Sequence, residues 1–192
     1  MNTIVYGGAF DPPQLAHQDL VRQIHQKFQP SNIIIVPSGP RSDKEYKVTG
    51  EHRRKIMQIF VAFIQEDFPN TELCEDFLLG KLPNTTLITD AFFQGKLGYS
   101  PTQVFGTDVI PSMPTWDPSK YVEQKIPKIF VSREGFHPDM SRLDQYTVLE
   151  PKFPKDIAAL SSTMIRENIK NRIFTGLNPK IEAYIKEHNL YQ

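Results

Sequence analysis

The sequence predicts an α/β protein with a doubly wound, mostly parallel sheet and a helical C-terminal part. Short apolar runs alternate with helical stripes along most of the chain, which is the pattern of strands and crossover helices in such sheets. A Gly-Gly pair ends the first apolar run and leads directly into a helical stripe. After Pro154 only helical periodicity continues. These three observations together predict the fold class.

Short runs rich in β-branched and aromatic residues are the expected strands. The first two, TIVY and NIIIV, are almost entirely apolar, as expected of strands buried on both faces of a parallel sheet. The expected strands cover residues 3–6, 32–36, 73–77, 104–106, 128–132 and 146–149.

Helices are expected where apolar residues recur every three or four positions. The first stripe covers 15–28 and ends before Pro30; its members are His17, Val21, Ile24 and Phe28. The remaining helices are expected over 51–68, 86–93, 161–174 and 178–191. In the segment 161–174 the apolar stripe is expected to continue to Ile173, and Asn178 with Pro179 should begin the last helix.

Length and charge limit what the chain can be. A length of 192 residues suits one domain, 1–192, in which 154–192 form the helical C-terminal part. Lys and Arg total 22, as do Asp and Glu, so no basic field for a nucleic-acid partner is expected. No apolar run reaches the roughly 18 residues of a membrane span, and the single Cys74 allows no disulfide within the chain. We therefore expect a cytoplasmic protein without a membrane partner, and a homo-oligomer is compatible with this composition.

The segment GGAFDPPQLAHQDL, residues 7–20, is the first candidate for chemistry. In an open parallel sheet the ligand crevice lies at the carboxyl ends of the strands, and the first strand-to-helix turn is its phosphate-facing corner. Glycines let the backbone approach a ligand, and a helix N-terminus adds partial positive charge. A tight turn without a ligand would use the same glycines. The chain contains neither G-x-G-x-x-G nor G-x-x-x-x-G-K-[ST], which excludes an NAD fingerprint and a P-loop.

Gln14 and His17 are three residues apart, so both are expected on one face of the first helical turn, toward that corner. A histidine there can donate to phosphate oxygens and, when protonated, neutralise charge on a phosphoryl group. The alternative is that His17 only continues the apolar stripe of its helix.

The segment SSTMIR, residues 161–166, is a second candidate phosphate site. Ser161, Ser162 and Thr163 open a helix, so their hydroxyls and free amides are expected to converge on one point, with Arg166 one turn later. An ordinary N-cap beside a solvated arginine is the alternative. Lys44, in the polar loop 37–50, would add a mobile cation to the same edge unless it is an ordinary surface lysine.

Asp108 and Trp116 lie in the Pro-rich loop that follows the expected strand 104–106. A long irregular loop of this kind is more often functional than a packing element. The broad face of Trp116 suits an aromatic ring of a ligand, although a lone tryptophan can also simply pack.

Together these segments resemble the nicotinate (or nicotinamide) mononucleotide adenylyltransferases, which are nucleotidylyl transferases with an H-x-G-H signature. GGAFDPPQLAH matches the family's G-G-x-F-D-P-x-H-x-G-H at all but two signature positions, and LSSTMIR matches its I-S-S-T-x-I-R. Further segments resemble the family in the same order along nearly the whole chain: KEYKVTGEHRRKIM, PNTTLITD, FGTDVIPSMPTW, VSREG and IEAYIKEHNLY. Their shared order makes the resemblance specific.

The resemblance implies a Rossmann-like nucleotidylyl transferase fold and transfer of AMP from ATP to a pyridine mononucleotide, with release of pyrophosphate. Mg²⁺ would accompany ATP, no metal site on the protein itself is implied, and no covalent enzyme intermediate is expected because the mononucleotide phosphate is itself a nucleophile. The residues implied to bind ATP are Gly8, Ala9, Phe10, His17, Gly106, Asp108, Ser162, Thr163 and Arg166. Those implied for the mononucleotide are Lys44, Thr85, Thr86, Trp116 and Arg133. Catalytic roles are implied for His17, Gln14 and Arg166.

Two signature positions differ from the family. Ala16 replaces a glycine, and its methyl group would approach the adenine. Gln14 replaces the first histidine, and losing a charge-assisted donor costs about 1.5–3 kcal/mol, or roughly ten- to hundredfold in rate. The alternatives are therefore a catalytically weakened nucleotide-binding relative, or adenylyl or cytidylyl transfer to another phosphorylated acceptor. The choice between nicotinate and nicotinamide stays open at this stage.

Overall fold

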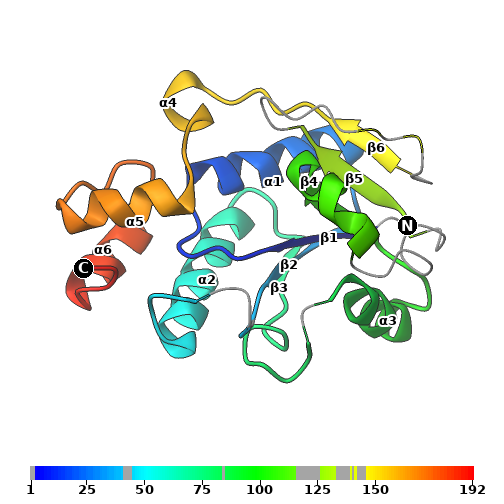
Figure 1. Ribbon diagram of the computed structural model, residues 1–192, viewed down its shortest axis with the longest axis horizontal. Helices are drawn as coiled ribbons and strands as arrows, with labels where there is room; N and C mark the ends of the chain where they lie inside the picture. Colours follow the sequence, from blue (N-terminus) through cyan, green and yellow to red (C-terminus); the bar gives the residue numbers. More distant parts are fainter. Residues whose placement is uncertain are drawn as a thin grey trace.

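The computed structural model describes residues 3–40, 45–83, 85–115, 126–132, 139, 141 and 146–192. Six parallel strands form one sheet in the order β3-β2-β1-β4-β5-β6 (Figure 1). The strands are β1 Thr3–Gly8, β2 Asn32–Pro37, β3 Thr71–Leu73, β4 Thr102–Gly106, β5 Lys128–Val131 and β6 Tyr146–Leu149. The strand order reverses between β1 and β4, which confirms the predicted doubly wound sheet and places the ligand crevice beside these two strands.

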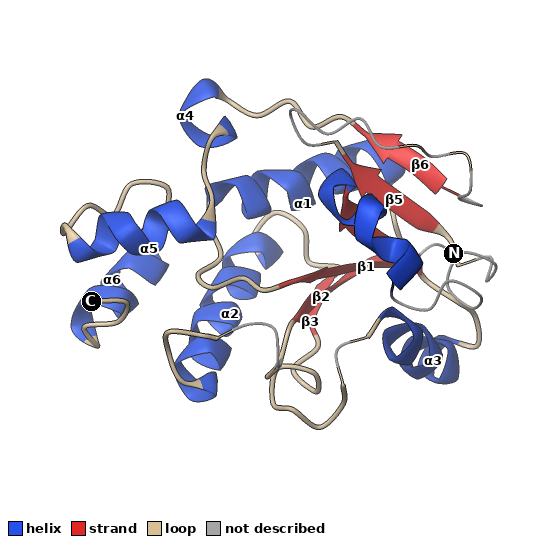
Figure 2. Cartoon of the chain, viewed as in Figure 1, coloured by secondary structure: helices blue, strands red, loops and turns tan. Residues whose placement is uncertain are grey.

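Helices connect the strands and continue after the sheet is complete (Figure 2). They are α1 Leu15–Phe28, α2 Gly50–Gln65, α3 Thr86–Leu97, the 3₁₀ helix η1 Thr107–Thr115, α4 Lys155–Ala158, α5 Ser162–Lys170 and α6 Pro179–Glu187. Polar side chains cap five of them as N-terminal residues: Gln14 for α1, Thr49 for α2, Thr85 for α3, Ser161 for α5 and Asn178 for α6. The Asn-Pro start predicted for the last helix is confirmed.

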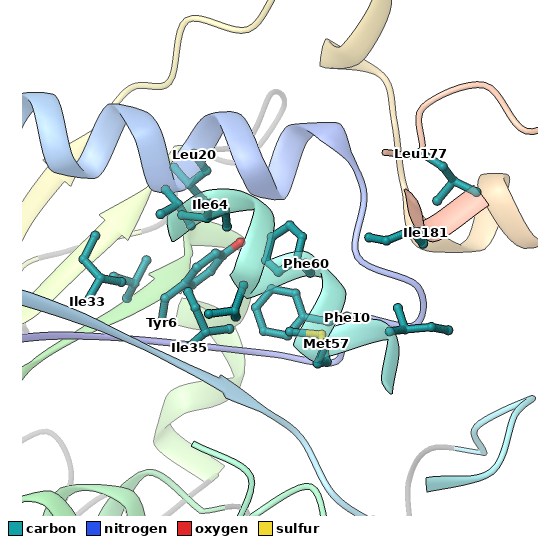
Figure 3. Close-up of a cluster of buried hydrophobic side chains, with 14 of the residues drawn as sticks. Tyr6, Phe10, Leu20, Ile33, Ile35, Met57, Phe60, Ile64, Leu177 and Ile181 are labelled. Carbon is teal, nitrogen blue, oxygen red and sulfur yellow. The ribbon is translucent and has the colours of Figure 1, made fainter. Parts of the chain in front are cut away.

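Alternation along β1 and β2 places their side chains in two apolar clusters, one on each face of the sheet. Ile4 and Tyr6 of β1, with Ile33 and Ile35 of β2, pack in one cluster with α1 and α2. Figure 3 shows Phe60 and Met57 of α2 in the middle of this cluster, with Ile181 of α6 at its edge. The C-terminal part of the chain therefore shares its core with the first half of the sheet.

The opposite face of the sheet packs against α3. Val5, Ile34 and Val36 alternate with the residues above, and they contact Phe77 and Phe93. Cys74 is buried in the same cluster, and burial raises the pKa of its thiol. The expectation that Cys74 is a small buried residue is therefore confirmed.

The prediction of a strand over residues 73–77 is wrong in its position. β3 covers Thr71–Leu73, and its pairing with β2 ends where the Cys74 N–H donates to the Ile35 carbonyl at 2.9 Å. The chain then turns, with the Gly80 N–H bonded to the Phe77 carbonyl at 3.0 Å. Phe77 lies in this turn, and its side chain is fully buried. Its burial therefore comes from packing of the turn against the core and not from a strand.

The predicted helix over 161–174 is too long. α5 ends at Lys170 with Asn171 as its C-cap, and the next residue, Arg172, adopts a left-handed φ of 58°. Ile165 and Ile169 are buried as predicted, whereas Ile173 is 49 % exposed. The spacing of three isoleucines four residues apart predicted one continuous helical stripe, but the helix ends one turn before the third of them. Within the described residues, no helix combines the length and apolar character needed to cross a bilayer.

Candidate functional site

The candidate site lies at the carboxyl ends of β1 and β4, where the strand order reverses. Tyr6 pairs with Val104 across the two strands, so Gly8 and Gly106, each two residues further on, end the strands side by side. η1 follows Gly106 directly and carries Asp108 in its first turn. The structure thus brings these three predicted ATP-side residues to one edge of the sheet.

Gly8 allows the first loop to fold back on itself. Phe10 has a left-handed φ of 46°, and its buried ring returns over the end of β1. A Cβ atom at Gly8 would lie 3.0 Å from two carbons of this ring, whereas at Gly7 the nearest atom would be 3.9 Å away. The Phe10 ring in turn packs edge-on against His17 at 5.0 Å between ring centroids. Gly8 therefore affects the position of His17 through Phe10.

Arg53 of α2 is hydrogen-bonded to the same loop. One of its terminal nitrogens, Nη2, donates to the carbonyls of Ala9 at 2.8 Å and Ser38 at 2.6 Å. The guanidinium lies 3.6 Å from the centre of the Tyr46 ring. Burial lowers the pKa of Arg53, and the neighbouring Tyr46 and Asp11 oppose that shift. Arg53 thus ties the loop after β1 to the loop after β2.

Gln14 is the N-cap of α1, and its side chain is used inside the protein. It is 6 % exposed. Its Oε1 accepts from the Ala16 N–H at 3.2 Å, and its Nε2 donates to the Leu160 carbonyl at 3.0 Å. The residue that replaces the first signature histidine therefore links the start of α1 to the loop before α5.

His17 completes a capping box with Gln14. The backbone N–H of Gln14 donates to Nδ1 of His17 at 3.1 Å. Because Nδ1 is the acceptor, the proton of the neutral imidazole is on Nε2, which makes this nitrogen a hydrogen-bond donor. The capping contact thus fixes both the tautomer and the orientation of the ring.

The second segment, 161–166, lies against the first loop. Ser162 Oγ donates to the Pro12 carbonyl at 2.9 Å, and Arg166 Nη1 donates to the Asp11 carbonyl at 2.7 Å. Together with the bond from Gln14 to the Leu160 carbonyl, these contacts join two segments about 150 residues apart in the chain. The two segments predicted to bind phosphate therefore lie against each other.

The prediction that the hydroxyls of Ser161, Ser162 and Thr163 converge on one point is wrong. Ser161 Oγ accepts from the Met164 N–H as an ordinary N-cap, and Ser162 bonds to the first loop. Thr163 Oγ1 accepts from Nη2 of Arg166 at 3.1 Å. Each hydroxyl has its own partner, because the helix rotates successive side chains by about 100°.

Of the predicted mononucleotide residues, the two that the structure describes, Thr85 and Thr86, make their hydrogen bonds away from this group. Thr85 and Thr86 begin α3, on the opposite face of the sheet from α1 and α2. Thr85 Oγ1 accepts from the Ile88 N–H at 3.3 Å, and the Thr86 carbonyl accepts from Gln103 of β4 at 3.4 Å. The other predicted residues of this group, Lys44, Trp116 and Arg133, lie outside the described residues.

Two buried groups of the site were not predicted from the sequence. Arg53 interrupts the apolar stripe of α2 at a position that helical spacing places on its buried face, and that signal was available. Asp11 is 1 % exposed, and it accepts a hydrogen bond from the hydroxyl of Tyr191 at 2.8 Å. A contact between residues 180 positions apart leaves no trace in a single sequence.

The described part of the chain contains no group of three or more His, Cys, Asp or Glu side chains placed to hold a metal ion. The described charged groups at the junction of the two segments are mainly cationic, with Arg53 and Arg166 around the carboxylate of Asp11. Such a site suits an anion, and its donors suit phosphate oxygens in particular.

Comparison with known proteins agrees with this geometry. A family model described as cytidylyltransferase-like matches residues 5–168. "Probable nicotinate-nucleotide adenylyltransferase" of Acholeplasma laidlawii is 28 % identical over 197 residues, covering 98 % of this chain and 97 % of the relative. The protein of the same name from Oceanobacillus iheyensis is 26 % identical, covering 97 % and 95 % of the two chains.

The fold also has solved counterparts. Plasmodium falciparum nicotinic acid mononucleotide adenylyltransferase, complexed with NaAD, superposes with a TM-score of 0.79. The match is 22 % identical and covers 99 % of this chain and 97 % of the other. A second structure of that protein, complexed with APC, has a TM-score of 0.78 at the same identity and covers 99 % and 96 % of the two chains. The Rossmann-like arrangement predicted from the motifs is therefore confirmed.

Proposed function

Because the chain belongs to the cytidylyltransferase-like family, we propose that it is an adenylyltransferase of NAD biosynthesis that transfers AMP from ATP to nicotinate mononucleotide. The products are the dinucleotide and pyrophosphate. The observation that carries this proposal is the junction between the loop after β1 and the start of α5. There, Gln14, Ser162 and Arg166 bond across the two segments and leave cationic groups beside a helix N-terminus.

The reaction is a direct displacement at the α-phosphorus of ATP. An oxygen of the mononucleotide phosphate forms a bond to that phosphorus while the bond to the bridging oxygen of pyrophosphate breaks. Both substrates are anionic, so the protein's task is to position them and to reduce their repulsion. His17 donates through Nε2 and Arg166 through its guanidinium to phosphate oxygens, while Gly8, Ala9 and Phe10 shape the loop beneath them.

The remaining ATP-side residues complete the pocket in this proposal. Gly106 and Asp108 at the end of β4 are assigned to the adenosine, and Ser162 and Thr163 at the start of α5 to the phosphates. Mg²⁺ enters with ATP as part of that substrate, and the described carboxylates offer no cluster that would hold it by themselves. Its chemistry is to neutralise phosphate charge.

Nicotinate is the favoured acceptor over nicotinamide. The relatives above carry nicotinate in their names. The first turn of α3 contains no acidic residue, so the partial positive charge at its N-terminus suits a carboxylate. We assign Thr85 and Thr86 to this end of the mononucleotide, together with Lys44, Trp116 and Arg133. Trp116 would stack on the pyridine ring, and Lys44 and Arg133 would serve the mononucleotide phosphate.

A panel of acceptors tests the proposed function. The protein is incubated with ATP, Mg²⁺ and either nicotinate or nicotinamide mononucleotide, and dinucleotide and pyrophosphate are measured. We expect both products in equal amounts and a higher kcat/KM with the nicotinate form. Phosphopantetheine and cytidine triphosphate serve as the alternative acceptor and donor. Turnover only with one of these would reassign the substrate, and no turnover with any pair would contradict an enzyme of this class.

Gln14 supports a second candidate, a weakened relative that binds nucleotide with slow turnover. Its amide is bonded to Ala16 and Leu160, and it cannot become cationic. If the missing charge limits turnover, Gln14→His raises kcat by roughly ten- to hundredfold, the value of one charge-assisted hydrogen bond. Calorimetric titration with ATP separates this change from a change in affinity. An unchanged kcat in the variant would show that Gln14 fully replaces the histidine.

A further inference from the structure

The carboxylate of Asp11 is an unusual neighbour for a phosphate-binding arginine. It is buried in the first loop, and its Oδ2 lies 4.0 Å from Nη1 of Arg166. A buried carboxylate and guanidinium at this range normally close into a two-point ion pair, with distances below 3 Å. Such a pair would neutralise Arg166 before ATP arrives.

Tyr191 binds the other carboxylate oxygen of Asp11. Its hydroxyl donates to Oδ1 of Asp11 at 2.8 Å, on the side of the carboxylate away from the long contact with Arg166. Tyr191 follows α6 and is itself buried in the main apolar cluster. Burial raises the pKa of the Tyr191 phenol, and the charge of Asp11 raises it further. The hydroxyl therefore keeps its proton and remains a donor.

Neutral acceptors fix Arg166 without cancelling its charge. Nη1 donates to the backbone carbonyl of Asp11, and Nη2 donates to the hydroxyl of Thr163. Arg53, the other guanidinium beside Asp11, likewise donates to the backbone carbonyls of Ala9 and Ser38. Among these three described groups, the two guanidiniums exceed the carboxylate by one positive charge, which an anionic ligand would neutralise.

We propose that Tyr191 is a positioning residue for ATP: by binding Asp11, it keeps the carboxylate from closing on Arg166 and leaves the guanidinium available to phosphate. This inference rests on the phosphate role given to Arg166 under the proposed function. It assigns a task in ATP binding to a side chain that lies beyond the last helix and belongs to neither motif. In Tyr191→Phe, Asp11 loses its donor and pairs with Arg166.

The test compares Tyr191→Phe with Tyr184→Phe in the full chain. The control also removes a tyrosine hydroxyl from the C-terminal segment, since Tyr184 OH bonds to Nδ1 of His52 at 2.9 Å. We expect Tyr191→Phe to raise KM for ATP about tenfold and to leave KM for the mononucleotide within about twofold. Tyr184→Phe should leave both unchanged. Equal increases for both substrates in Tyr191→Phe, or no increase for ATP, would overturn the proposal.

Removing the charge of Asp11 supplies a rescue that a purely structural role would not give. In the double variant Asp11→Asn with Tyr191→Phe, no carboxylate remains to capture Arg166, so KM for ATP should return to within about threefold of the wild type. Asp11→Asn alone, which is informative even if Tyr191→Phe does not fold, should lower KM for ATP, because it removes the carboxylate that lies 4.0 Å from Arg166 and competes with phosphate. A higher KM in this variant would contradict the proposal. A double variant no better than Tyr191→Phe would contradict capture of Arg166.

Calorimetric titration with ATP separates this inference from the proposed function. If the wild type makes no dinucleotide but Tyr191→Phe still weakens ATP binding about tenfold, the acceptor reaction is wrong and the positioning role stands. If the wild type makes dinucleotide and Tyr191→Phe binds ATP as tightly as the wild type, the proposed reaction stands and the positioning role is wrong.

Discussion

The loop after β1 depends on single side chains whose effects reach the reacting groups through contact. Gly8 leaves room for the Phe10 ring, Phe10 packs on His17, and His17 is oriented by the backbone of Gln14. Gln14 itself was predicted to face phosphate on the same side as His17. Its described hydrogen bonds instead cap α1 and reach the Leu160 carbonyl. Gln14, which stands where the family has its first histidine, therefore makes structural contacts within the protein.

Gly8→Ala should weaken ATP binding, whereas Gly7→Ala should not. The new methyl at Gly8 would lie 3.0 Å from two ring carbons of Phe10, so the ring must move and His17 must follow. Overpacking of this kind costs about 1–3 kcal/mol, which predicts roughly a tenfold rise in KM for ATP if the cost falls on the binding-competent loop. Steady-state kinetics measure it. Equal KM values for the two alanine variants would show that Phe10 does not transmit the change.

At the scale of elements, the apolar periodicity predicted most helices and strands because their buried faces follow helical or alternating spacing. α1 and β2 illustrate this, since Val21 and Ile24 and the run of Ile33 to Val36 are all buried. The failures have a common cause. Phe77 is buried in a turn, and Ile173 is exposed in a loop. In both cases tertiary packing, and not the local spacing of apolar residues, determines the structure.

His25 couples α1 to β3 and should make stability depend on pH. Its ring stacks on Phe68 at 4.4 Å, its Nε2 hydrogen bonds with Thr71 Oγ1, and burial lowers its pKa from 6.5. The unfolded chain then binds more protons than the folded one just below pH 6.5, so stability falls as the pH drops from about 7 toward the folded pKa.

Urea unfolding at pH 7 and pH 5 measures the effect of His25. His25→Gln keeps a side chain that can bond to Thr71 but does not titrate, so it should reduce the loss of unfolding free energy between the two pH values. His188→Gln, a change at an exposed histidine, is the control for other acid effects. The same loss in wild type and His25→Gln would exclude His25 as the source.

At the scale of the whole molecule, the candidate site forms because residues of the C-terminal part, in α5 and after α6, pack against the loop after β1. Both segments proposed to bind phosphate were found in the sequence, and the structure places them in contact through the bonds of Gln14 and Arg166. Their mutual contacts were beyond prediction, because the bonds of Ser162 to Pro12 and of Tyr191 to Asp11 depend on how α5 and α6 pack into the main apolar cluster. A hydrogen bond between one hydroxyl and one distant carbonyl or carboxylate produces no periodic pattern in the sequence, so the sequence does not predict it.

The central claim, adenylyl transfer at this junction, is tested most directly by the rate of dinucleotide formation from ATP and nicotinate mononucleotide in the wild type and Arg166→Gln. We predict measurable turnover in the wild type and a kcat/KM for ATP that is roughly ten- to hundredfold lower in Arg166→Gln, the cost of one charge-assisted contact. Arg172→Gln, the same change at an exposed position after α5, should match the wild type. Wild-type kinetics in Arg166→Gln, or no dinucleotide from the wild type, would contradict the account.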